Sequence, residues 1–133
     1  MLINIFDEVL NIVADILNST VLPLANQRNL LFLLSNMLAG PSHNKNSPDF
    51  CAKTLIFSNE VVSNYIFEKL HNYDSLDILN EAMVCVRNMV FKAPVAVQGS
   101  IVSKYDLINL MLDLCDVEKV VSMALDVLII VLA

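Results

Sequence analysis

The sequence contains no tryptophan, two glycines, three cysteines and only eight basic residues among 133. Two isolated glycines cannot form the glycine-rich loop that cradles a phosphate. Cys51, Cys85 and Cys115 are odd in number and contain no C-x-x-C pair, so they predict buried free thiols in a reducing compartment, cytoplasmic or nuclear. Fourteen acidic residues give a net charge of −6, which argues against nucleic acid as a partner and is compatible with a basic ligand.

Long hydrophobic runs are also missing. The longest apolar stretch, 120–133, is shorter than the roughly 20 residues of a membrane-spanning helix and contains Asp126. No basic residue precedes Arg28, so the start of the chain does not resemble a targeting peptide. His43 and His71 each lack a second histidine or cysteine at ligand spacing. We therefore expect no membrane partner, no metal, no cofactor and no catalytic nucleophile, hence a protein that is not an enzyme.

What the chain does contain is hydrophobic residues at helical spacing. They make up 56% of the sequence, and the scarcity of turn residues predicts an all-α fold. An amphipathic helix begins the chain, with Ile5 and Ile16 among its buried stripe, and ends near Ser19. The segment 30–38 is apolar nearly all round, so we expect neighbouring helices to cover most of it. The polar run 41–48 reads as an inserted loop.

Capping residues divide the rest of the chain into two series of helices, each short, then medium, then long. In the first series, a helix begins at Ser47, Pro48 and Asp49 and ends at about Phe57. Ser58 caps the second helix. Asp74 or Ser75 caps the third helix, which has Leu76 in its buried stripe and cannot continue past Pro94. The second series comprises a helix over 94–103, a helix over 107–115 capped by Asp106, and a helix opened by Asp116, whose buried stripe includes Leu125, Ile129 and Leu132.

One short sequence motif recurs near the ends of two of these helices. Leu34-Ser35-Asn36-Met37 is matched by Val86-Arg87-Asn88-Met89, and Ile130 occupies the corresponding place in the last helix. Asn88 and Ile130 lie 42 residues apart in the sequence, within the roughly 40–47 residues of armadillo and HEAT repeats. Asn36 and Asn88 lie 52 apart, which fits the same phase if the 41–48 loop is an insertion. Three helices per repeat favour the armadillo type.

The same segments resemble the armadillo repeats of importin-α, the adaptor that binds nuclear localisation signals. The resemblance is carried by the segments 33–41, 80–83 with Asn88, 101–104, 109–114 and 119–126. It suggests a divergent piece of the C-terminal half of the array. It implies a right-handed superhelical solenoid of about three repeats within one fragment, 1–133, with a partial repeat at 1–40, the loop at 41–48, and repeats at 49–93 and 94–133.

The resemblance also implies a binding site. In that family, a Trp-x-x-x-Asn pair on the third helix of each binding repeat holds an extended basic peptide in a concave groove. Asn36 and Asn88 match the asparagines, Ser35 a small residue before one of them, and Glu81 an acid near the tryptophan position. Phe32 and Val84 stand where the tryptophans would be, and each weakened cation–aromatic contact costs about 0.5–2 kcal/mol. Arg87 adds a positive charge beside Asn88.

The implied partners are basic segments of cargo proteins, with other transport factors and self-association through the apolar ends as further possibilities. Two rival functions stay open: an armadillo scaffold for a different partner in adhesion, signalling or the cytoskeleton, and a small helical bundle with an unrecognised enzymatic role. Simpler roles also exist for the site residues. Asn36 and Asn88 can bond to an adjacent turn, Phe32 can belong to the core, and Glu81 can be a solvated acid near a helix start.

Overall fold

In the computed structural model, which describes residues 2–39 and 52–133, all regular secondary structure is helical. The predicted all-α class is confirmed. The expected loop at 41–48 and the cap at Ser47, Pro48 and Asp49 lie outside the described residues. In chain order the elements are α1 (Leu2–Ser19), α2 (Leu24–Leu38), α3 (Ala52–Ser58), α4 (Glu60–Glu68), the short 3-10 helix η1 (Lys69–His71), α5 (Leu76–Val90), α6 (Val95–Lys104), α7 (Leu107–Leu114) and α8 (Val121–Leu132).

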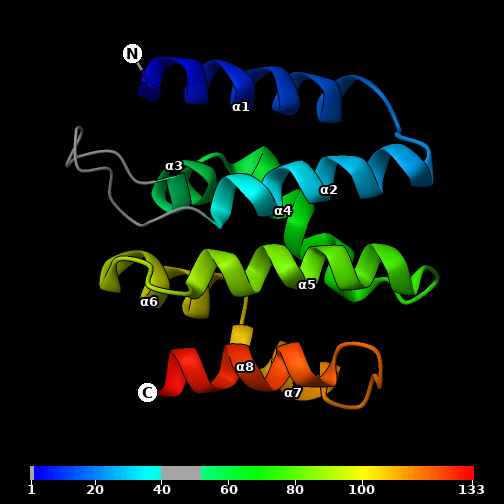
Figure 1. The fold of residues 1–133 in the computed structure, drawn as a ribbon, viewed down its shortest axis with the longest axis vertical. Coiled ribbons are helices and arrows are strands. Elements are labelled where there is room, and N and C mark those ends of the chain that lie inside the picture. Colours follow the sequence, from blue (N-terminus) through cyan, green and yellow to red (C-terminus); the bar gives the residue numbers. More distant parts are fainter. Residues whose placement is uncertain (1, 40–51) are drawn as a thin grey trace.

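The helices form layers that follow one another along the longest axis of the molecule. Figure 1 shows α1 at one end, followed by α2, α5 and α8, with α4 behind α2 and α5 and with α7 behind α8. The chain enters α2, α5 and α8 from the same side, so these three helices run in the same direction, while α1 runs the opposite way. Of all the helix pairs, α2 and α5 share the most extensive contact.

Contacts between helices repeat with the predicted order of the segments. The long helices α2, α5 and α8 pack on one another in turn, α1 packs on α4, and α3 packs on α6. One continuous cluster of buried side chains joins them, from Leu10 in α1 through Leu34, Leu79 and Met111 to Val127 in α8. Each layer therefore covers the apolar side of the next.

Local capping explains where the middle helices begin. The Asn59 side chain accepts a hydrogen bond from the Val62 backbone N–H at 3.2 Å and caps α4. The expectation that Ser58 plays this part is wrong, because Ser58 is the last residue of α3. The expected cap at Ser75 is confirmed, since its hydroxyl accepts from the Ile78 N–H at 3.4 Å.

The last two helices begin differently from the prediction. Asp106 precedes α7 as expected, but its backbone is left-handed (φ 49°), and its carboxylate accepts from the Asn109 side-chain amide at 3.1 Å instead of capping the helix. Asp116 does not open α8. The chain forms consecutive turns over 115–120, and α8 begins at Val121.

Several apolar side chains that were expected inside lie at the surface. Phe32 is 57% exposed and Leu33 43%, so the segment 30–38 is covered on one side only, through Leu31, Leu34 and Leu38. The same correction applies along the edges of the other stripes, at Ile5, Ile16, Leu76, Leu125, Ile129 and Leu132. These helices pack against fewer neighbours than the breadth of their apolar stripes predicts. No described helix is both long and hydrophobic enough to cross a bilayer.

Candidate functional site

The three parallel helices α2, α5 and α8 present one row of accessible residues each. Phe32, Asn36 and Ala39 follow one another at i, i+4 and i+7 and therefore share one side of α2. On α5 the corresponding row contains Glu81, Val84, Asn88 and Phe91, and on α8 it contains Asp126, Ile129 and Ile130. The C-terminal ends of the three rows meet at one cavity, which is lined by Ala39, by Asn88 and Phe91, and by the three residues of the α8 row. We call these rows the α2/α5/α8 face.

Both asparagines expected in the site lie on this face. Asn36 is exposed, and its side chain has no hydrogen bond within the described residues. Asn88 is half-buried and donates through Nδ2 to the backbone oxygen of Ser35 at 3.1 Å. The Asn88 bond thus crosses from α5 to α2 instead of running to an adjacent turn. Its amide oxygen keeps no partner among the described residues and can accept from a ligand.

Ser35 belongs to the contact between α2 and α5. It is 4% exposed, and its hydroxyl donates to the Phe32 backbone oxygen at 2.8 Å. One turn earlier, the Cys85 thiol donates to the Leu31 backbone oxygen at 3.1 Å. Burial, followed by the nearby Glu81 carboxylate, raises the pKa of Cys85 to about 12, so the thiol stays protonated. The two cross-helix bonds, from Cys85 and Asn88, fix the register of α5 against α2.

The remaining predicted residues are accessible. Phe32 is exposed, and Glu81 and Val84 are half-buried along the same side of α5. The register set by the cross-helix bonds puts Phe32 level with the turn of α5 that contains Val84. Glu81 lies one turn before it and makes no ion pair within the described residues. The exposed Phe32 ring on α2 and the Glu81 carboxylate on α5, which has no ion pair within the described residues, thus lie on neighbouring helices within about one turn of each other.

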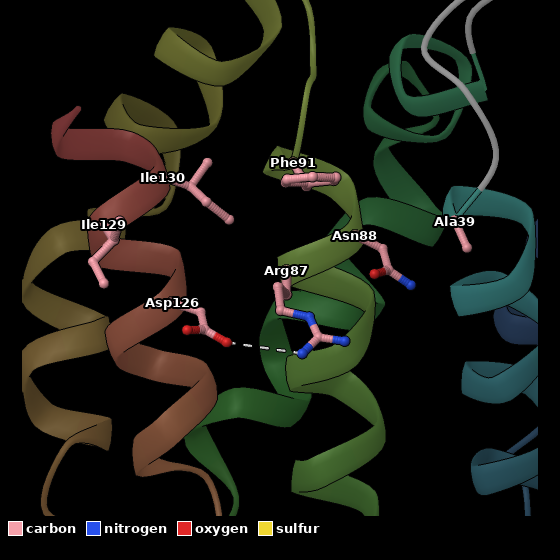
Figure 2. A pocket seen from close by; sticks show the side chains of 7 residues that line it. All are labelled: Ala39, Arg87, Asn88, Phe91, Asp126, Ile129 and Ile130. Carbon is pink, nitrogen blue, oxygen red and sulfur yellow. Dashed lines mark ion pairs between the residues drawn. The ribbon is translucent and has the colours of Figure 1, made fainter.

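A pocket of about 500 Å³ opens between the C-terminal parts of α5 and α8, and Figure 2 shows its walls. The Arg87 guanidinium, on α5, reaches the Asp126 carboxylate, on α8, at 3.9 Å. Both side chains are partly exposed, at 39% and 51%. The other lining residues are Ala39, Asn88, Phe91, Ile129 and Ile130. The pocket thus combines apolar side chains with one partly exposed ion pair.

A second ion pair joins α5 to the turn before α8 at the opposite end of the face. Lys119 Nζ donates to Asp77 Oδ1 at 3.0 Å. The hydrogen bond from Lys119, then its charge, then the charge of Arg28 hold the pKa of the Asp77 carboxyl below its usual value. Of the carboxylates of Asp77, Glu81 and Asp126, the first and the last are paired with Lys119 and Arg87. Glu81 has no ion pair within the described residues, so its carboxylate can bind a cation of a ligand.

Lys53, on α3, connects two helices of the α2/α5/α8 face. This lysine is 3% exposed, and its ammonium donates to the Leu38 backbone oxygen at 3.1 Å and to the Asn88 backbone oxygen. Leu38 ends α2 and Asn88 lies in the last turn of α5, so one side chain from α3 binds the C-terminal ends of both helices. Sequence reasoning missed Lys53, because a single lysine in an apolar segment carries no pattern.

Sequence reasoning also missed the pocket. Asp126 lies 42 residues after Val84, the spacing that separates Asn88 from Ile130, so the repeat phase would have placed it on the face. Arg87 was recognised only as a positive charge beside Asn88. Nothing in the sequence indicated that these two side chains pair. No group of histidine, cysteine, aspartate or glutamate suited to a metal ion occurs within residues 2–39 and 52–133.

Neither a protein-family model, nor a curated protein, nor a solved structure matches this chain.

Proposed function

We propose that this chain is a non-catalytic, peptide-binding piece of an armadillo-type solenoid, resembling importin-α, whose α2/α5/α8 face binds an extended basic segment of a partner protein. The observation that carries the proposal is that the carboxamides of Asn36 and Asn88 lie on the neighbouring helices α2 and α5, with Glu81 on the same side of α5 and without an ion pair among the described residues. The repeated contacts of α2 with α5 and of α5 with α8 support the stacked arrangement.

The binding chemistry follows from the side chains that remain available. A carboxamide can donate to a peptide carbonyl and accept from a peptide N–H, so Asn36 and the free oxygen of Asn88 suit an extended backbone of any sequence. Glu81 suits a lysine or arginine side chain, and Phe32 offers a ring face to its aliphatic stem and cation. Ser35 contributes through packing, because its buried hydroxyl is already bonded. Val84 provides only apolar contact.

The direct test is a titration of a fluorescently labelled lysine-rich signal peptide against the parent chain and against Asn36→Ala. Asn36 is exposed and has no internal partner, so its replacement leaves the fold intact and removes backbone hydrogen bonds to the ligand. We expect about tenfold weaker binding, equivalent to roughly 1.4 kcal/mol. Asn11→Ala, exposed on α1, is the matched control. Equal affinity for all three proteins, or no binding by the parent, would refute the proposal.

A scaffold for a different protein partner is the second candidate, and the position of Arg87 favours it. Its guanidinium lies on the α2/α5/α8 face beside Asn88, where it repels cations, and no tryptophan compensates for that repulsion. Competition between lysine-rich and glutamate-rich peptides of equal length separates the two functions. Preferential binding of the acidic peptide, weakened by Arg87→Ala, would favour the scaffold.

A further inference from the structure

The pocket between α5 and α8 differs in chemistry from the space between α2 and α5. Between α2 and α5, the Glu81 carboxylate makes no ion pair with any residue that the structure describes. Between α5 and α8, the Arg87 guanidinium lies 3.9 Å from the Asp126 carboxylate. Arg87 thus occupies the position that a cation of a ligand would take beside Asp126. A second cation there would meet the Arg87 charge and find no free acid.

Apart from Asn88, the remaining wall of the pocket is apolar. Phe91, Ile129 and Ile130 line it, and Ile129 is 68% exposed. An uncharged aliphatic side chain would cover these groups without breaking the ion pair, and its burial would be favourable in proportion to the apolar area removed from water. The pocket volume of about 500 Å³ leaves room for such a side chain.

We infer that the α5–α8 pocket binds a leucine-like side chain of the peptide ligand, while the α2–α5 space beside Glu81 binds its basic residue. The inference rests on the proposed function and specifies its ligand. Packed helices lie about 8–10 Å apart, and an extended chain of the polyproline II type advances about 3.1 Å per residue and returns a side chain to the same side at every third residue. The two side chains are therefore about three positions apart in the peptide, a basic residue and an aliphatic one.

Labelled peptides test this specificity. One pair carries lysine and leucine three positions apart, in either order, and the matched pair replaces the leucine with a second lysine. We expect the parent chain to bind the better leucine peptide at least tenfold more tightly than its lysine counterpart. Arg87→Ala frees Asp126, so binding of the lysine counterpart should tighten about fivefold while the leucine peptide changes less than twofold. Equal binding by the parent, or an unchanged ratio in Arg87→Ala, would overturn the inference.

A second measurement separates the pocket from the proposed function. Methyl NMR of Ile129 and Ile130 follows the addition of N-acetyl-leucinamide or N-acetyl-lysinamide, which needs no peptide binding. The pocket assignment is supported if only the leucine compound shifts the methyl signals, and if these shifts are lost in Ile129→Asp and kept in Leu112→Asp. This result would support the pocket even if no peptide bound and the proposed function were wrong. Leu112 is a suitable control because it is 53% exposed on α7 and does not line the pocket. Equal shifts with both compounds, or none, would contradict the assignment.

Discussion

Lys53 is a buried lysine whose ammonium lies at the ends of two helices. Its ammonium binds the backbone oxygens of Leu38 and Asn88, near the C-termini of α2 and α5. These ends carry partial negative charge and unpaired carbonyl groups, so an ammonium there is favourable where an apolar side chain is not. The same contact holds the ends of two helices of the α2/α5/α8 face at one distance.

Replacing Lys53 therefore tests how strongly the face depends on this support. Lys53→Met retains the aliphatic stem and removes the ammonium, and we expect the free energy of unfolding to fall by about 2–4 kcal/mol. The control Lys119→Met removes a partly exposed partner of Asp77 and should cost less than about 1 kcal/mol. Urea titration followed by circular dichroism measures both. Similar losses in the two variants would show that the carbonyl contacts contribute little.

Cys85 makes stability sensitive to alkaline pH. Burial, followed by the Glu81 carboxylate, raises the pKa of this thiol from its ordinary value of 9.0 to about 12. Below pH 9 the thiol is protonated in both states, whereas above it the unfolded chain loses the proton first. The free energy of unfolding should therefore fall by about 1.4 kcal/mol per pH unit as the pH rises above 9 and through the folded pKa.

The matched variant is Cys85→Ala, which should be less stable at neutral pH but show a shallower slope between pH 9 and 10. Burial, with a smaller contribution from Cys85, raises the pKa of Tyr65 to about 12. Tyr65 therefore starts to add to the slope only above its ordinary pKa of 10.0. Urea titrations at closely spaced pH values provide the slopes. Parallel profiles for the parent and Cys85→Ala below pH 10 would contradict the assignment.

At the scale of single elements, the start of α4 depends on one side chain. Asn59 caps the helix through its bond from the Val62 N–H, whereas the adjacent Ser58 ends α3 and is exposed. We expect Asn59→Ala to lower the free energy of unfolding by about 1 kcal/mol and Ser58→Ala to change it by less than half as much. Thermal unfolding of both variants gives the comparison. The reverse order would restore Ser58 as the cap.

These elements also show how far sequence reasoning reaches. The helix over 76–90 was predictable because Ser75 supplies a cap, Pro94 a stop, and residues such as Leu79 and Met83 a buried stripe. The late start of α8 was not predictable, because Asp116 is a good cap in isolation and only the packed chain favours turns over 115–120. The exposure of Leu33 was missed because a continuous apolar segment does not reveal which side lacks a neighbour.

The candidate site also has one part that the sequence predicts and another part that it does not. Repeat phase was enough to pair Asn36 with Asn88, and the two residues lie on helices that pack side by side and run in the same direction. It could not determine that Asn88 donates to Ser35 or that Arg87 meets Asp126, because these contacts depend on the register and rotamers of packed helices. The part of the site set by periodicity is predictable, and the part set by side-chain pairing is not.

At the scale of the whole molecule, α5 is the central element. It packs against α2, α4, α6, α8 and η1, and Leu79 and Met83 are fully buried within it. Leu79→Ala should therefore lower the free energy of unfolding by about 2–5 kcal/mol in a single transition. Leu125→Ala, 49% exposed on α8, should change it by about 0.5 kcal/mol. Two separate transitions in the Leu79 variant, by urea titration with two optical probes, would contradict this central role.

The common direction of α2, α5 and α8 gives the molecule two electrically distinct borders. Each helix carries roughly half a positive charge at its first turn and half a negative charge at its last, and three aligned helices add these partial charges along opposite borders. Parallel macrodipoles repel one another, and the Lys53 ammonium offsets part of that repulsion on the carbonyl side. A strand lying across the three helices would consequently have one flank beside amide hydrogens and the other beside carbonyl oxygens, so its left and right sides are not interchangeable.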